Sequence, residues 1–127
     1  MAVLEKILYV DDEPDIQLIA QLALETVGGF TVRLCSSGKQ ALSEVTKFRP
    51  QLLLLDVMMP EMDGPTTLEE LRKLDVTTAT PVIFMTAKVQ PQEVAQYKAL
   101  GALDVIAKPF DPMTLSDQVR QIWESAT

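Results

Sequence analysis

The feature that most constrains the fold is an uninterrupted run of four leucines, 52–55, that leads directly into the carboxylate of Asp56. A short apolar run bounded by turn residues is typical of a strand buried on both faces, as in a parallel sheet. Ligands of open α/β sheets bind beyond the carboxyl ends of the strands, where Asp56 would lie. A lone aspartate after a strand more often starts a turn or caps a backbone amide, so the rest of the chain decides its role.

Similar apolar runs alternate with segments of helical periodicity along the whole chain. Strands are predicted at 7–10, 31–34, 52–55, 82–85 and 103–106. The first helix follows Pro14 and ends at Gly28-Gly29, and further helices are predicted at 38–47, 66–74, 92–100 and 114–124. Strict alternation implies a parallel sheet with right-handed crossovers and helices on both faces. The fold class is therefore α/β, a doubly wound sandwich of five strands and five helices.

Length and composition limit the classes of protein that fit. The 127 residues suit one domain, 1–127, and no stretch approaches the roughly 20 apolar residues of a membrane span. The start resembles no signal peptide. Asp and Glu outnumber Lys and Arg by 18 to 11, which disfavours direct binding to nucleic acid or an anionic membrane. The single cysteine, Cys35, is expected to be a small buried apolar residue in a reducing, cytoplasmic protein.

The chain contains no histidine, which excludes histidine triads, imidazole zinc sites and a phosphohistidine donor. Its chemistry must use carboxylates, hydroxyls and lysines. Such residues follow four of the five predicted strands; they are Asp11, Asp12, Asp56, Thr86 and Lys108. Each has an ordinary explanation alone, as a helix N-terminal acid, a turn hydroxyl or a surface charge. Because the carboxyl ends of parallel strands share one edge, we expect all five side chains in the same crevice.

Three clustered carboxylates repel one another unless a cation neutralises them. Oxygen ligands alone favour Mg²⁺, which binds one or two carboxylates, several waters and a phosphoryl oxygen. An aspartate can attack phosphorus, and phosphoryl transfer depends mainly on positioning and charge neutralisation. The sequence therefore predicts a Mg²⁺-dependent phosphoryl site, with Lys108 and Thr86 contributing to the neutralisation.

In combination these motifs resemble the receiver domains of two-component response regulators, in particular the single-domain chemotaxis type. The resemblance covers essentially all 127 residues. It rests on Asp11-Asp12, on Asp56 within Leu-Leu-Leu-Leu-Asp-Val-Met-Met-Pro-Glu-Met-Asp-Gly, on Thr86-Ala87 and on Lys108-Pro109-Phe110. It implies a flavodoxin-like three-layer sandwich with strand order 2-1-3-4-5.

The resemblance also implies a ligand set and an acceptor. Asp56 is the phosphoacceptor, and it ligates Mg²⁺ together with Asp12 and the backbone carbonyl of Met58. Asp11 assists through the water shell of the metal.

By the same resemblance, Lys108 pairs with the acceptor carboxylate and then with the phosphoryl group. The Lys108-Pro109 bond is implied to be cis, which the sequence permits. Thr86 moves to hydrogen-bond the phosphoryl group and so couples the chemistry to a protein surface.

The expected function is phosphorelay signal transduction, not enzymatic turnover. The phosphoryl group comes from a sensor histidine kinase or a histidine phosphotransfer protein. The signal leaves as changed contacts with an effector protein through the surface of helix four, strand five and helix five, and phosphorylation-driven homodimerisation through that surface stays open.

One departure from the family pattern affects the switch. An aromatic residue or histidine often stands three residues before the strand-five lysine, and here that residue is Val105. Met58 and Lys88 occupy positions that influence access of water to the phosphoryl group in the family. The alternative for this pair is a packed thioether and a solvated lysine.

Three rival functions fit parts of the pattern. A haloacid-dehalogenase-like phosphatase needs a second aspartate where Met58 stands, and a cap domain. A flavodoxin-like binder of flavin or nucleotide needs amide-rich residues after the first strand, where Asp11-Asp12-Glu13 would repel a phosphate. The third is a receiver-like interaction module that is not phosphorylated, suggested by Val105 alone.

Overall fold

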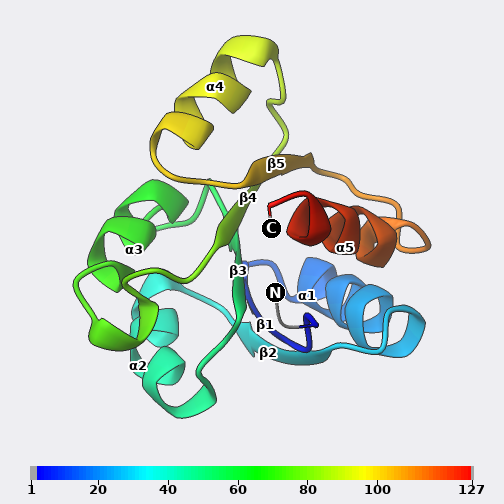
Figure 1. The fold of residues 1–127 in the computed structure, drawn as a ribbon, viewed down its shortest axis with the longest axis horizontal. Helices are drawn as coiled ribbons and strands as arrows, with labels where there is room; N and C mark the ends of the chain where they lie inside the picture. Colours follow the sequence, from blue (N-terminus) through cyan, green and yellow to red (C-terminus); the bar gives the residue numbers. More distant parts are fainter. Residues whose placement is uncertain (1–2, 127) are drawn as a thin grey trace.

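The computed structural model describes residues 3–126, and within them five parallel strands form one sheet in the order β2-β1-β3-β4-β5 (Figure 1). The strands are β1 (Lys6–Val10), β2 (Thr31–Cys35), β3 (Leu52–Asp56), β4 (Val82–Thr86) and β5 (Asp104–Ala107). The α-helices are α1 (Pro14–Gln21), α2 (Gly38–Phe48), α3 (Gly64–Leu71), α4 (Pro91–Ala99) and α5 (Leu115–Ser125). The doubly wound α/β sandwich and its strand order are confirmed.

The sheet is the middle of three layers. Helices α1 and α5 cover one face, and α2 and α3 cover the other (Figure 1). Successive side chains of β1 point to opposite faces of the sheet. Ile7 and Tyr9 pack toward α1 and α5, whereas Leu8 packs toward α2 and α3. The leucines of β3 are fully buried, and burying one such side chain contributes about 1.5–3 kcal/mol. The apolar run that predicted a strand buried on both faces therefore forms the central strand of the core.

Most helix boundaries differ from the sequence prediction by one residue, and three larger differences concern the first helix, α3, which also ends at Leu71 instead of 74, and the segment after α3. The first helix continues from α1 into a π-helical segment, η1 (Leu22–Val27), before Gly29 turns the chain with φ +78°. Helix α3 starts at Gly64 and not at 66, because the Asp63 carboxylate accepts a hydrogen bond from the Thr66 amide at 2.8 Å and caps the helix. A short 3₁₀ helix, η2 (Asp75–Thr77), lies where a loop was expected, and the Thr77 hydroxyl secures it to the Leu71 carbonyl.

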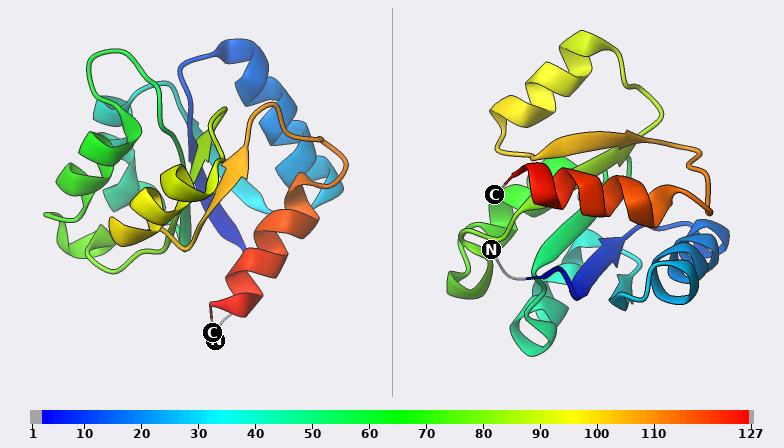
Figure 2. Two further views of the ribbon diagram at one scale, coloured as in Figure 1. Left: turned by 90° about the horizontal axis from the view of Figure 1, so that it is seen from above. Right: turned by 45° about the vertical axis from the view of Figure 1, so that its right-hand side comes forward.

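Helix α4 is attached less firmly than the other helices. None of its side chains is buried, and it lies above β5 apart from the other helices (Figure 2). Its main aromatic contact joins Tyr97 to Phe84 of β4, with ring centroids 5.2 Å apart. Among the described residues, no helix is both long and apolar enough to cross a membrane.

Candidate functional site

The site lies at the carboxyl edge of the sheet, where hydrogen bonds continue just past the strands. The Asp11 amide donates to the Cys35 carbonyl, and the Val57 amide donates to the Met85 carbonyl, both at 3.0 Å. Asp56 is the last residue of β3, where it pairs with Met85 of β4, and Leu55 just before it pairs with Val10 of β1. The backbone beneath the predicted acids is therefore fixed by the sheet, which suits a site that needs defined geometry.

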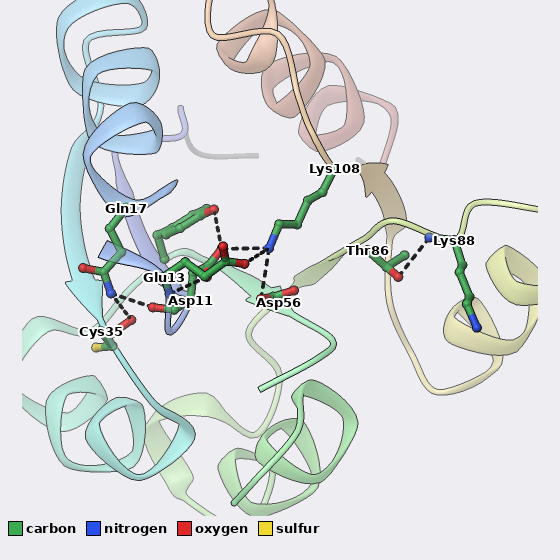
Figure 3. A network of polar contacts seen from close by, with 9 residues as sticks. Asp11, Glu13, Gln17, Cys35, Asp56, Thr86, Lys88 and Lys108 are labelled. Atoms are coloured by element: carbon green, nitrogen blue, oxygen red, sulfur yellow. Dashed lines mark hydrogen bonds and ion pairs between the residues drawn. The ribbon is translucent and has the colours of Figure 1, made fainter. Parts of the chain in front are cut away.

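Lys108 connects two of the predicted acids. Its Nζ lies 3.1 Å from Asp11 Oδ2 and 3.1 Å from Asp56 Oδ2 (Figure 3). The side chain of Lys108 is 14% exposed, that of Asp56 5% and that of Asp11 0%. Glu13 lies further away, 3.8 Å from the ammonium, on a side chain that is largely exposed. The structure thus brings Asp11, Asp56 and Lys108 into one buried contact, with Glu13 at its outer side.

The Asp11 carboxylate is held by donors on both oxygens. Oδ1 accepts a hydrogen bond from the Glu13 amide at 3.0 Å. Oδ2 accepts one from the Tyr9 hydroxyl at 3.2 Å, in addition to the contact with Lys108. The sequence analysis did not select Tyr9; its signal was a hydroxyl inside the otherwise aliphatic end of the first apolar run.

Gln17 is a second residue that the sequence analysis did not select. Its side-chain amide donates to the carbonyl oxygens of Asp11 and Cys35, at 2.5 and 3.3 Å (Figure 3). It therefore ties the loop that carries the acids to the end of β2. Its position on the sequence, in the second turn of the first helix, gave no signal of this contact.

Asp12 completes a group that could hold a metal ion. Carboxylate oxygens of Asp11, Asp12 and Asp56 all lie within 4.8 Å of one another, and Asp12 is partly exposed. The donors are oxygen only, and one ammonium faces three carboxylates. This donor set fits a hard divalent cation such as Mg²⁺ and disfavours softer metals.

Burial and neighbouring charges shift the pKa values within the site. Burial raises the pKa of Asp56 to about 6, with the hydrogen bond from Lys108 opposing the shift and the charge of Asp11 adding to it. For Lys108, burial lowers the pKa, but the hydrogen bonds to Asp11 and Asp56 outweigh burial and raise it overall. Burial also raises the pKa of Tyr9, so its hydroxyl stays protonated. At neutral pH the lysine is charged and Asp56 is mainly ionised.

Thr86 ends β4 on the other side of Asp56. Its hydroxyl is buried and accepts a hydrogen bond from the Lys88 amide at 3.2 Å, so it is directed away from the acids (Figure 3). The Lys88 side chain is exposed. The Lys108-Pro109 bond is cis, as the resemblance implied.

The structure also shows the burial of three further residues that the sequence analysis discussed, Met58, Val105 and Cys35. Met58 is 77% exposed, so the alternative of a packed thioether is wrong for this side chain. Val105 is half-buried in β5 opposite Phe84 of β4. Cys35 is buried as expected, and burial raises its pKa to about 12, which keeps the thiol protonated.

A parallel sheet with three carboxylates and a lysine at its carboxyl edge fits a domain that accepts a phosphoryl group. Residues 7–120 match the family model of the response regulator receiver domain. The chain therefore belongs to the receiver domain family of two-component response regulators.

Individual relatives agree with this assignment. The chain is 39% identical over 117 residues to sporulation initiation phosphotransferase F of Bacillus subtilis, covering 92% of each chain. It is 38% identical over 122 residues to the probable transcriptional regulator ycf27 of Pyropia yezoensis, covering 96% of this chain and 49% of that one. This chain thus spans about half the length of the latter relative. The structure of the chemotaxis response regulator CheY4 of Vibrio cholerae matches with a TM-score of 0.85 and 29% identity, covering 94% of this chain and 98% of that one.

Membership of this family sets the functional class. Receiver domains take part in phosphorelay signal transduction, interact with histidine kinases or phosphotransfer proteins and generally bind Mg²⁺ at an acidic pocket. They accept phosphoryl groups and are not enzymes in the usual sense. The dehalogenase-like, flavodoxin-like and non-phosphorylated alternatives are not favoured.

Proposed function

We propose that residues 1–127 form a receiver domain that accepts a phosphoryl group on Asp56 and changes its protein contacts in response. The donor would be a sensor histidine kinase or a histidine phosphotransfer protein in the cytoplasm. The observation that carries this proposal is the pair of 3.1 Å contacts that Lys108 makes with Asp11 and Asp56, beside the partly exposed Asp12.

Asp12, Asp56 and the backbone carbonyl of Met58 would hold the magnesium ion, with Asp11 acting through its water shell. The oxygen-only donor set and the 4.8 Å spacing of the carboxylates support this assignment. When bound, Mg²⁺ would neutralise charge on the phosphoryl oxygens. Because the site holds more carboxylates than ammonium groups, it would attract a cation before it binds the negatively charged phosphoryl group.

The residues of the chain would divide the chemistry among them. An oxygen of Asp56 forms a bond to phosphorus while the bond from phosphorus to the donor breaks, and the leaving group keeps the electron pair. The Lys108 ammonium, which neutralises the Asp56 carboxylate in the resting protein, is within reach of the new phosphoryl oxygens. The Thr86 hydroxyl would turn from the Lys88 amide to donate to a phosphoryl oxygen.

The signal would leave through the surface formed by α4, β5 and α5, where an effector or a second copy of this chain docks. Two observations support this surface. Helix α4 buries none of its side chains, and a pocket of about 400 Å³ is lined by Lys98, Asp104 and Gln121 from the three elements. The side chain of Val105 is smaller than an aromatic ring, so it would transmit the movement of Thr86 to the surface less effectively. We therefore assign the main conformational change to helix α4 and to the loop that joins β4 to it.

The proposal is tested by intact mass after incubation with Mg²⁺ and a small-molecule acyl phosphate. We expect one base-labile phosphoryl adduct on the native chain, and none on Asp56→Ala or in the presence of a chelator. Asp15→Asn, which neutralises an exposed acid on α1, is the matched control and should keep the adduct. An adduct that persists in Asp56→Ala would refute the acceptor. A native chain that binds Mg²⁺ but forms no adduct, even with a cognate kinase, would favour the non-phosphorylated interaction module.

A further inference from the structure

We propose that Tyr9 is a positioning residue of the acidic site, whose hydroxyl orients the Asp11 carboxylate for Mg²⁺ binding. This inference rests on the proposed function and adds a residue to it. Its basis is the 3.2 Å hydrogen bond from Tyr9 Oη to Asp11 Oδ2. Groups that hydrogen-bond the carboxylates and imidazoles around a metal fix the orientation of those groups and thereby affect metal affinity.

The donors around Asp11 differ in how firmly they are held. The Glu13 amide fixes Oδ1 from the backbone of the same loop. Oδ2 has two donors, Lys108 and Tyr9. The lysine is long and flexible, and in the proposed reaction it follows the charge that develops on Asp56. Tyr9 is then the side-chain donor that stays on Oδ2 while Lys108 moves.

Tyr9 is suited to this role because its ring cannot move independently of the sheet. It is 1% exposed and lies in β1, between Leu34 of β2 and Leu54 of β3. The ring packs in the core beneath α1 and α5, with only its hydroxyl reaching the acids. A hydroxyl carried by a buried strand residue holds its partner more rigidly than one carried by a loop.

A purely structural reason for the contact is that a buried tyrosine needs some hydrogen-bond partner. That reason does not account for the partner being a fully buried carboxylate that also accepts from Lys108. A hydrogen bond to an ionised acceptor is roughly twice as strong as a neutral one. The two explanations differ in one measurable respect, since only the positioning role changes the affinity for Mg²⁺.

The test compares Tyr9→Phe with Tyr97→Phe, because the chain contains two tyrosines. Both substitutions remove one hydroxyl, and Tyr97 lies on α4 against Phe84 and away from the acids. Mg²⁺ affinity is measured by isothermal titration calorimetry without a phosphodonor. We expect the dissociation constant to rise about tenfold in Tyr9→Phe and to stay within twofold in Tyr97→Phe. Tenfold is the low end of the range for residues that orient the groups around a metal, and we take the low end because Asp11 would act through the water shell. A Tyr9→Phe value within twofold of the native one would overturn the proposal, as would equal changes in both variants.

Phosphorylation at varied Mg²⁺ gives a second readout. In Tyr9→Phe the Mg²⁺ concentration for half-maximal rate should rise by the same factor, whereas the rate at saturating Mg²⁺ should stay within twofold of native. A lower rate at saturating Mg²⁺ with unchanged Mg²⁺ requirement would contradict positioning of Asp11 for the metal. Failure of the native chain to bind Mg²⁺ would instead count against the proposed function itself.

A measurement on the native sequence covers the case in which Tyr9→Phe does not fold. The chain is labelled with 3-fluorotyrosine, and Tyr97→Phe assigns the two ¹⁹F resonances. Mg²⁺ should shift the Tyr9 resonance and leave that of Tyr97 in place. A Tyr9 resonance that does not respond at saturating Mg²⁺ would refute the coupling of this hydroxyl to the metal site.

Discussion

At the scale of one residue, burial of the ionised Asp56 carboxylate lowers the stability of the fold. The ordinary pKa of an aspartate carboxyl in water is 3.8, and burial raises the pKa of Asp56 to about 6 in the folded protein. The folded state therefore holds more protons than the unfolded state between these two values, so this group makes stability fall as pH rises from about 4 to 6. Above pH 6 the full cost of burying the ionised carboxylate remains.

Asp56→Asn should therefore raise the free energy of unfolding at pH 8 in the absence of metal. A shift of about two pKa units corresponds to nearly 3 kcal/mol, and this net shift already includes the opposing contact with Lys108, so we expect a gain of about 1–3 kcal/mol. The gain should shrink toward zero at pH 4, where Asp56 is protonated. Urea denaturation across this pH range measures it.

The matched control for this prediction is Glu69→Gln, which neutralises an exposed acid of α3. It should change the free energy of unfolding by less than about 0.5 kcal/mol at any pH in the range. A native chain that is more stable than Asp56→Asn at pH 8 without metal would show that Lys108 compensates the buried charge fully.

At the scale of the element, the start of α3 directly supports the end of β3, which carries Asp56. The Gly64 amide donates to the Val57 carbonyl at 2.9 Å, so the helix begins almost against the end of β3. A Cβ at position 64 would lie 2.5 Å from the Asp56 carbonyl oxygen and 3.0 Å from Val57 Cα. Both atoms belong to the backbone, so neither can rotate aside as a side chain would.

Gly64→Ala should consequently lower stability and disturb the site together. Overpacking of this kind costs about 1–3 kcal/mol, and the displaced Asp56 should bind Mg²⁺ more weakly. Thermal unfolding and calorimetric Mg²⁺ titration measure the two effects. Thr66→Ala, in the same helical turn but exposed, is the control and should change neither by much. If the Gly64→Ala protein is destabilised but binds Mg²⁺ with native affinity, the start of α3 does not control the position of Asp56 in the site.

At the scale of the whole molecule, the acidic edge couples ion binding to stability. The chain carries a net charge of −7, and three of its acids share this edge. A ligand that binds only the folded state stabilises it by about 2.7 kcal/mol at one hundred times its dissociation constant. A cation that binds the site around Asp56 should therefore also raise the free energy of unfolding.

We expect Mg²⁺ to raise the melting temperature of the native chain, and the rise to vanish with a chelator. Asp12→Asn should melt at or above the temperature of the native chain without Mg²⁺, because it relieves repulsion among the three carboxylates, and it should gain little when Mg²⁺ is added, because it lacks one of the carboxylates that would hold the ion. Differential scanning calorimetry at constant ionic strength separates this effect from charge screening. Equal stabilisation of Asp12→Asn would assign the effect to ions elsewhere on the acidic surface.

The sequence predicted most of this molecule because its signals were local. Fully buried strands need continuous apolar runs, and strand ends share an edge whatever the details of packing. The reach of Tyr9 and Gln17 to Asp11 was not predictable, because it depends on ring orientation and on the packing of α1 against β2. The exposure of Met58 likewise depends on how its loop leaves the sheet. Contacts of this kind are set by tertiary structure, which periodicity does not encode.

The ion pair between Asp11 and Lys108 joins residues that are 97 positions apart, and the one with Asp56 spans 52. During synthesis the acids leave the ribosome long before the lysine, so the nascent chain carries an uncompensated cluster of negative charge until β5 docks. Contacts between distant residues also make folding slower, because forming them closes long loops. A partly made copy that ends before Lys108 therefore has the acids without the lysine that neutralises them.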